Sequence, residues 1–417
     1  MKRRVAPATT TPGKMARLAP PIADFRLAST RSVPIFFETC SKGGFTELNI
    51  QGWNELTTRQ LADALKTAEG VTDVYASEWE PYQSWKYRTF DDGEVQTLLR
   101  VTKSTLHLNV ATTAPVPLLR NQQLRIAHID CTLDSAYSGH MADGSFKFLS
   151  NARQVKQLVA AIKRQPALRS VRLHGPLLSE QDVAAICTAC TGLEALEFCA
   201  CDLPREALPH LTMLLRTSTT MRSLVVDEDD PTSPSPQIFQ GEHLPDFVEA
   251  LKESRLGVFH AKACNIWGTA QGLDLVKACV GHPTIKELSF SSNTSEELGM
   301  EERKAIGRAY TALVAASPSA LTSLSMYWND IFDETLSIMA PFFKALGKNK
   351  TLQHLDIGLN SISHVRDFTP IIDGAMRCTS LRHLEVDLGD VDAEEDTSGY
   401  RDNEAALLEA IDTIANR

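Results

Sequence analysis

Long apolar runs are missing from this chain of 417 residues. No stretch approaches the roughly 18 uncharged apolar residues that a membrane-spanning helix needs. The first residues also lack the apolar segment of a Sec signal peptide. We therefore expect a chain with no membrane span and no Sec signal, which acts in a reducing cytoplasm or reaches a host cell by type III secretion.

Motifs of the common enzyme classes are missing as well. The sequence contains no GxxxxGK[ST], HExxH or GxSxG pattern. His354, Asp356 and His383 could form a metal or acid–base group, but no carboxylate–His–nucleophile order accompanies them. We expect no catalytic residue, no metal and no cofactor.

Positive charge is in the minority, with 42 Lys and Arg against 52 Asp and Glu and a formal net charge of −10. Residues 1–32 hold seven basic residues and one acid, so the remainder carries −16. This balance argues against nucleic-acid binding by the body and favours a protein partner with a basic or mixed patch. Residues 1–34 are rich in Pro, Thr, Ala and Arg without an apolar period, so we expect a disordered basic tail over residues 1–44.

A repeat runs through the rest of the chain, and its clearest copy is LQHLDIGLNSI from Leu352. Leu or Ile stands at positions 1, 4, 6 and 11, with Asn360 at position 9. First positions recur at Leu168, Leu193, Met221, Leu256, Ile285, Leu321, Leu352 and Leu381. Weaker copies begin at Phe45, at Val71, over residues 104–110 and at Leu124.

Apolar residues at spacings of three and four between these strands predict helices over residues 155–165, 182–190, 246–254, 273–281, 335–346 and 404–416. The pattern resembles leucine-rich repeats of the ribonuclease-inhibitor type. That resemblance implies an α/β solenoid, a horseshoe with parallel strands on the concave face and helices on the convex face. We expect irregular repeats and an aromatic cap over residues 45–167, then regular repeats and a capping helix over residues 168–417.

Position 9 should hydrogen-bond buried backbone at the strand ends. Cys201, Cys264, Asn293, Asn329 and Asn360 fit that role, whereas Pro176, Asp229 and Gly389 predict irregular turns. Cys187, Cys190, Cys199 and Cys201 have a spacing that suggests zinc, but the repeat places them on different sides of one coil. The nine Cys show no disulfide-scaffold spacing.

Three segments depart from the repeat. Residues 75–90 hold Tyr75, Trp79, Tyr82, Trp85, Tyr87 and Phe90, which form either an N-terminal cap or a binding patch. Residues 227–237 read as a solvated loop, with a regulatory role as the alternative. Residues 137–145 read as an exposed loop.

Strand alternation places positions 4 and 6 in the core and positions 3, 5 and 7 on the concave surface. The candidate protein-binding residues are Tyr327, Trp328, His354, Asp356, His383, Arg172, His260, Tyr75, Trp79 and Trp85. A non-catalytic scaffold for a protein partner is the leading hypothesis, and the tail resembles those of type III secreted bacterial effectors. One alternative is a regulator of a small GTPase, for which Arg172 is the candidate side chain, or of a ubiquitin ligase. The other is a ubiquitin-ligase-like enzyme with an unrecognised catalytic Cys.

Overall fold

The computed structural model describes most of the chain, in two compact units. Residues 1–76 with 97–106 form unit one, and residues 77–96 with 107–417 form unit two. The described residues are 22–26, 33–42, 47–51, 57–68, 70–76, 90–133, 135–140, 146–150, 152–175, 178–228, 238–268, 271–293, 299–332, 336–360, 365, 367–386 and 398–417.

Unit one contains three parallel strands, β1 (Ile22–Arg26), β2 (Glu47–Gln51) and β3 (Asp73–Tyr75). Helices α1 (Val33–Lys42) and α2 (Thr58–Thr67) connect them, and a capping box between Thr57 and Gln60 starts α2. Two further elements, α3 (Asp92–Val101) and β4 (Thr105–Thr112), cross the boundary between the units.

The predicted disorder of the tail is wrong at residues 22–26 and 33–42. Strand β1 pairs in parallel with β2 over five residues, and α1 follows it. In α1, Phe36 and Cys40 lie one helical turn apart and are fully buried. Composition missed this strand because its hydrogen-bond partners lie more than 20 residues further along the chain. Residues 1–21 lie outside the described residues.

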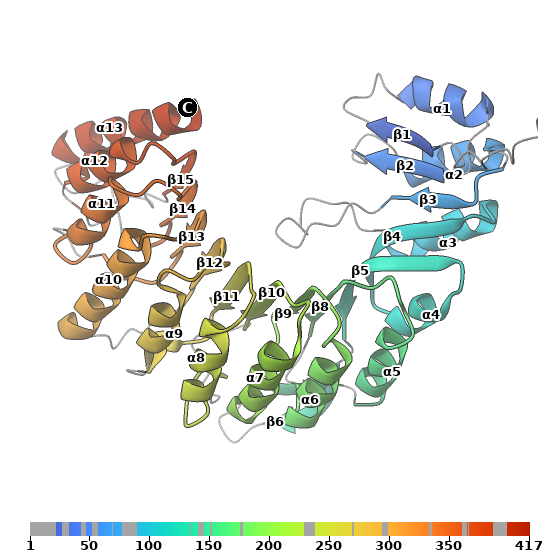
Figure 1. The fold of residues 1–417 in the computed structure, drawn as a ribbon, viewed down its shortest axis with the longest axis horizontal. Helices are drawn as coiled ribbons and strands as arrows, with labels where there is room; N and C mark the ends of the chain where they lie inside the picture. The colour runs from blue at the N-terminus through green and yellow to red at the C-terminus, as the bar shows by residue number, and fades with distance from the viewer. Residues whose placement is uncertain are drawn as a thin grey trace, which may run out of the picture. The chain divides into compact units, whose positions relative to one another are not determined.

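Unit two is built on one sheet whose strands lie side by side in chain order (Figure 1). Within this sheet, all described pairings from β5 to β15 are parallel. After β4, the strands are β5 (Leu124–Thr132), β8 (Ser170–His174), β9 (Ala195–Cys199), β10 (Ser223–Asp227), β11 (Val258–Lys262), β12 (Glu287–Ser289), β13 (Ser323–Ser325), β14 (His354–Asp356) and β15 (His383–Glu385). The α/β solenoid predicted from the repeat is confirmed.

Helices return the chain between these strands and pack beside one another along one side of the sheet (Figure 1). They are α4 (Pro115–Arg120), α5 (Ala152–Ile162), α6 (Glu180–Ala189), α7 (Leu208–Thr217), α8 (Leu244–Lys252), α9 (Gly272–Cys279), α10 (Met300–Ala315), α11 (Ala340–Leu346), α12 (Thr369–Arg377) and α13 (Ser398–Ala415), with 3-10 turns η4 (Arg205–Ala207) and η5 (Ile266–Gly268). Among the described residues no helix is long and apolar enough to span a membrane.

The core lies between the sheet and these helices. Positions 4 and 6 of the repeats are buried as predicted, for example Leu355 in β14 and Ile357 directly after it. Phe259 links two repeats, since its ring centroid lies 6.2 Å from that of Phe239 and 6.1 Å from that of Phe290. Alternation along the strand therefore leaves positions 3, 5 and 7 on the other face.

Two segments between strands differ from expectation. Strands β6 (Ser135–His140) and β7 (Phe146–Ser150) form an antiparallel pair, so the predicted loop is wrong at residues 137–140. The long insertion folds back on itself, which a parallel repeat pattern does not reveal. Residues 141–145 lie outside the described residues, as do residues 229–237 of the predicted solvated loop. The predicted boundary at residue 168 falls between β5 and β8, which pair directly.

Candidate functional site

Buried asparagines tie the strand ends of neighbouring repeats together. The Asn293 side chain donates to the carbonyls of Ala261, Phe290 and Ser291 at 2.8–2.9 Å and accepts from the Cys264 backbone N–H at 2.9 Å. Asn329 and Asn360 repeat this arrangement one strand further on each time. The predicted ladder is confirmed there, and the turns that follow the strands are held rigidly.

Cysteine replaces asparagine in two earlier repeats, as predicted. The thiol of Cys201 lies 3.4 Å from the Leu173 carbonyl oxygen, and that of Cys264 lies 3.7 Å from the Val226 carbonyl oxygen. Pro176, Asp229 and Gly389 lie outside the described residues, so their predicted irregular turns stay predictions.

A left-handed residue precedes the ladder position in five repeats. Ala200, Ala263, Ser292, Trp328 and Leu359 have φ between +48° and +56°, all at position 8. Three of these residues are small, which keeps the cost of a positive φ low. The repeat at β13 instead carries Trp and the repeat at β14 carries Leu, although bulky side chains are disfavoured in this conformation.

Trp328 and Leu359 are exposed neighbours at the edge of the sheet where β13 and β14 end. Trp328 is 47% exposed and Leu359 is 38% exposed. The Trp328 N–H donates to the Gly358 carbonyl at 2.9 Å, which holds the two turns together. Sequence reasoning identified Trp328 but missed Leu359, which occupies the same position of the next repeat.

Tyr327 lies on the strand face beside this pair and is half-buried, not packed in the core. A Cβ atom at Gly358 would lie 3.1 Å from Tyr327 Cδ2, so the ring packs over the glycine. We call Tyr327, Trp328 and Leu359 the apolar edge.

Polar side chains adjoin the apolar edge on β14 and β15. The exposed rings of His354 and His383 have centroids 6.0 Å apart. Asp356 accepts from the Ser325 hydroxyl at 2.7 Å and from the Gly358 N–H at 3.1 Å. The structure therefore brings together five of the candidate residues, Tyr327, Trp328, His354, Asp356 and His383.

The middle of the strand face is less accessible than predicted. Glu197 is only 3% exposed, and Val225, Ser289 and Ser291 are also buried. Because neighbouring strands are only about 4.8 Å apart, long side chains cover the short ones beside them. The alternation of residues along a strand therefore predicts which face a side chain points to, but not whether it is exposed to solvent. The prediction that positions 5 and 7 are solvated is therefore wrong at Glu197, Val225 and Ser289 (position 5) and at Ser291 (position 7).

Arg172 belongs to a charge cluster on β5, β8 and β9. Its guanidinium donates to Glu197 Oε2 at 2.6 Å and lies 3.7 Å from Asp130 Oδ2. Asp130 also lies 3.1 Å from His174 Nε2. Burial raises the pKa of Asp130, but the hydrogen bond and charge of His174 and the charge of Arg172 outweigh it and hold the pKa below its usual value.

His128 lies beside this cluster, buried, with its Nδ1 at 2.8 Å from the Ser170 hydroxyl. Burial lowers the pKa of His128 to about 4, so the ring is neutral near pH 7. His260, another candidate, is half-buried with Nε2 at 3.0 Å from Glu287 Oε1. Six strand spacings of about 4.8 Å separate β8 from β14, so Arg172 and the apolar edge are distinct sites.

The cysteines that suggested zinc lie at different places in their repeat. Cys187, Cys190 and Cys201 are buried, and Cys199 is half-buried on the strand face. Burial raises the pKa of Cys187 and of Cys199 to about 12, which disfavours the thiolate that metals and nucleophilic catalysis require. No cluster of three or more His, Cys, Asp or Glu that could hold a metal occurs among the residues that the structure describes.

The aromatic segment is described only at its ends. Tyr75 is half-buried on β3 of unit one, in register with Asn49 on β2. Phe90 is fully buried, as a core or cap residue would be. Trp79 and Trp85, with Tyr82 and Tyr87, lie outside the described residues.

No family model matches this sequence, and no curated protein aligns with it significantly. Solved structures similar to the chain are leucine-rich-repeat proteins. The leucine-rich repeat-containing protein LegL7 from Legionella pneumophila is 12% identical, with 92% of this chain and 97% of that chain covered and a TM-score of 0.30.

Two receptor structures are also similar. Toll from Drosophila, in complex with Spätzle, is 12% identical over 84% of this chain and 43% of that chain, with a TM-score of 0.30. TLR13 in complex with ssRNA13 is 14% identical over 85% of this chain and 48% of that chain, with a TM-score of 0.32. The chain thus spans about half the length of these two receptors.

Proposed function

We propose that the chain is a non-catalytic scaffold that captures a protein partner at the apolar edge and the adjoining strand face. The observation that carries this proposal is the pair of exposed bulky side chains, Trp328 and Leu359, at a backbone position that favours small residues. A left-handed Trp costs about 1 kcal/mol relative to Gly. Strain of this kind, kept at an exposed site, is typical of a functional surface.

The geometry supports recognition because the surface is held in place before a partner arrives. The buried Asn293, Asn329 and Asn360 side chains fix the turns that carry Trp328 and Leu359. A rigid aromatic anchor loses little conformational entropy on binding, and Trp and Tyr dominate the energetics of protein interfaces.

Charge on the strand face defines the partner further. The candidate face carries six carboxylates and two cations, a formal charge of −4 with histidines neutral: Asp130, Glu197, Asp227, Glu287, Asp356 and Glu385 against Arg172 and Lys262. Some are paired within the face, but near the apolar edge Glu385 is exposed. A partner with an apolar pocket and a basic rim fits this surface.

Capture of a partner by full-length protein tests the proposal. Exchanging Trp328→Gly together with Leu359→Gly removes both side chains and keeps the left-handed backbone accessible. Met213→Ala on α7 is the matched control, because Met213 is 59% exposed but lies on the helix side. We expect the double variant to lose a partner that wild type and control retain; equal retention by all three would contradict the site.

The finer part of the proposal is that the partner belongs to a host cell reached by type III secretion. The basic composition of the first residues supports it. Because β1 and α1 pack in unit one from residue 22, a clean test removes residues 2–21 only. Loss of export with retained partner binding would support this role, and unchanged export would count against it.

A GTPase-activating role finds less support. Arg172, the side chain nominated for it, already bonds Glu197 at 2.6 Å. An arginine that stabilises a transferring phosphate has to be free to reach it. GTP hydrolysis by a panel of small GTPases, with and without the protein, tests this alternative.

A further inference from the structure

A second surface lies on the helix side of unit two, where α10, α11 and α12 pack together. Two neighbouring hollows of about 480 Å³ and about 290 Å³ open there, and Lys344 and Lys348 line both. Lys350 lines the larger hollow. Arg377 lines the smaller one together with Asp373, whose carboxylate lies 3.2 Å from the Arg377 guanidinium. We call this pair of hollows the basic groove.

The lysines of the basic groove differ from those on α8, α9 and α10, which are each paired with a carboxylate of their own helix. On α8, α9 and α10, Lys252, Lys277 and Lys304 each lie 2.7–2.8 Å from a carboxylate three residues earlier. Such pairs cancel the charge of the exposed helix surface.

Lys344, Lys348 and Lys350 have no carboxylate within 4.0 Å among the residues that the structure describes. Helix α11 contains no acidic residue, and Pro341 stands three residues before Lys344. Lys344 and Lys348 are four residues apart, a spacing at which like charges repel. Their proximity to the end of α11 offsets part of this repulsion. Three uncompensated cations in one place thus stand out on a chain whose net charge is −10.

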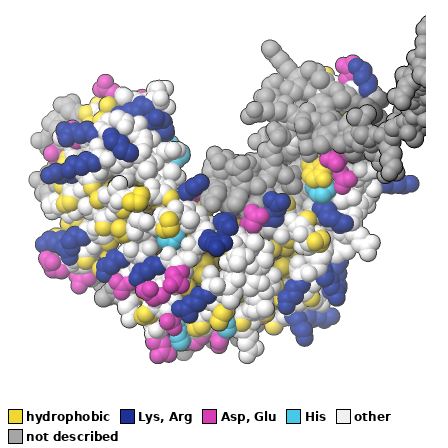
Figure 2. Space-filling view, in the orientation of Figure 1, with side chains coloured by type: hydrophobic (Ala, Val, Ile, Leu, Met, Phe, Trp, Pro, Cys, Tyr) yellow, Lys and Arg dark blue, Asp and Glu magenta, His cyan; other side chains and the backbone are white. Residues whose placement is uncertain are grey.

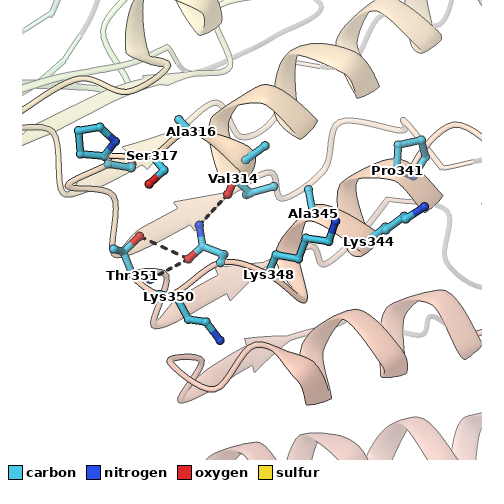
Figure 3. Close-up of a pocket in the computed structure, with 13 residues that line it drawn as sticks. Val314, Ala316, Ser317, Pro341, Lys344, Ala345, Lys348, Lys350 and Thr351 are labelled. Atoms are coloured by element: carbon cyan, nitrogen blue, oxygen red, sulfur yellow. Dashed lines mark hydrogen bonds between the residues drawn. The ribbon is translucent and has the colours of Figure 1, made fainter.

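Part of the wall of the larger hollow is apolar, and hydrogen bonds hold the loop that carries its lysines. Ala316 and Pro341 line it with Ala345, as Figure 3 shows. The buried Asn349 side chain donates to the Val314 carbonyl at 2.7 Å and accepts from the Leu352 N–H at 2.7 Å. Asn349 therefore fixes the segment that carries Lys348 and Lys350.

A comparable hollow between α8 and α9 provides an internal reference. Its volume is about 340 Å³, and Lys252 and Lys277 line it. Glu249 and Asp274 line it too and pair with those lysines. The two places share their architecture and differ in net charge. Figure 2 shows Lys and Arg side chains gathered over the α11 and α12 region with few carboxylates among them.

We propose that the basic groove binds a short acidic segment of a partner protein. Helix axes pack 8–10 Å apart, so a groove across three helices is about 18 Å long and accommodates about six extended residues. Carboxylates of such a segment meet the three free ammonium groups, and its aliphatic carbons contact Ala316, Pro341 and Ala345. The strand face is acidic, so the two surfaces select partners of opposite charge and act independently.

Fluorescence anisotropy with full-length protein and a fluorescein-labelled, end-capped hexaglutamate peptide tests this. The variant Lys344→Gln with Lys348→Gln and Lys350→Gln should bind the peptide at least tenfold more weakly. The matched control, Lys252→Gln with Lys277→Gln, should stay within twofold of wild type. A hexaglutamine peptide should not bind, and a rise from 50 to 200 mM salt should weaken the hexaglutamate complex.

Equal affinities of the triple variant and wild type would overturn the proposal, as would equal losses in the triple variant and the control. Binding to phosphatidylserine vesicles is measured as well. If the protein bound these vesicles through the same lysines but did not bind hexaglutamate, the groove would be a membrane-binding surface and the proposal of an acidic peptide ligand would be wrong. Circular dichroism verifies that the variants fold. The Trp328→Gly and Leu359→Gly exchanges should leave peptide affinity unchanged, which separates this test from that of the strand face.

Discussion

Asn329 joins its own repeat to the two preceding ones through one side-chain atom, since its Oδ1 accepts from the Asn293 backbone N–H at 3.0 Å and from the Trp267 ring N–H at 3.2 Å. All three residues are buried. The arrangement satisfies donors that no water could reach, and it links β12 to β13 below the apolar edge.

Exchanging Asn329→Ala should therefore lower the free energy of unfolding by about 3 kcal/mol, because at least two buried donors lose their acceptor. Urea denaturation followed by circular dichroism measures this. Gln353 is exposed and stands directly before β14, so Gln353→Ala should change the free energy of unfolding by less than about 0.5 kcal/mol. A loss for Asn329→Ala as small as for Gln353→Ala would contradict the ladder.

Trp328→Gly should leave stability unchanged or raise it by up to about 1 kcal/mol. The residue has φ +53°, which Gly adopts without strain, and its side chain is 47% exposed. Thermal denaturation of the single variant measures the effect. A fall in the melting temperature of more than a few degrees would show that Trp328 packs as a core residue and does not serve recognition.

Arg172→Ala should destabilise the chain by about 3 kcal/mol, because it leaves the buried Glu197 without the cation 2.6 Å away. The double exchange Arg172→Met with Glu197→Met should recover most of the loss, since it removes both charges. Chemical denaturation of the double variant and of the single exchanges Arg172→Met and Glu197→Met completes the cycle. An additive double variant would show that the pair is not coupled.

Glu228 gives the chain a pH dependence of a definite sign. Burial, with a smaller contribution from the charge of Asp202, raises the pKa of Glu228 to about 8, and Oε1 has no hydrogen-bond partner among the described residues. The unfolded carboxyl has its ordinary pKa near 4.5. The folded state therefore holds a proton that the unfolded state releases, so stability falls as pH rises from 4.5 to 8.

The variant Glu228→Gln should lack this loss, since its side chain stays neutral at every pH. We expect the difference in unfolding free energy between variant and wild type to grow by a few kcal/mol from pH 5 to pH 8. Denaturation midpoints measured at both pH values provide the comparison. A difference that does not change with pH would mean that Glu228 is ionised in the folded protein.

Much of the fold follows from the sequence because each repeat is local. Leu355, Ile357 and Asn360 define their strand and turn within six residues, and the structure confirms each role. Strand β1 was not predicted because its pairing with β2 is not local and because the residues around it are rich in Pro, Thr, Ala and Arg. The left-handed conformation at position 8 was not predicted, because Trp and Leu, unlike Gly or Asn, give no sequence signal of a positive φ.

The candidate site was only partly within reach of sequence reasoning. Alternation placed Arg172 and Glu197 on one face, but it could not show that they bond each other and lose access to solvent. The basic groove was missed because its lysines come from a helix and the loop after it, and because their lack of partners is a property of three dimensions.

Hydrogen–deuterium exchange of the full chain with a captured partner, compared with the free chain, tests the central claim most directly. We predict slower exchange in residues 323–330 and 354–360, where β13 and β14 lead into the turns of Trp328 and Leu359. Helices α7 and α8, on the opposite side of the sheet, should exchange as in the free chain. Protection confined to the helices, with none at residues 323–330, would contradict recognition by the strand face.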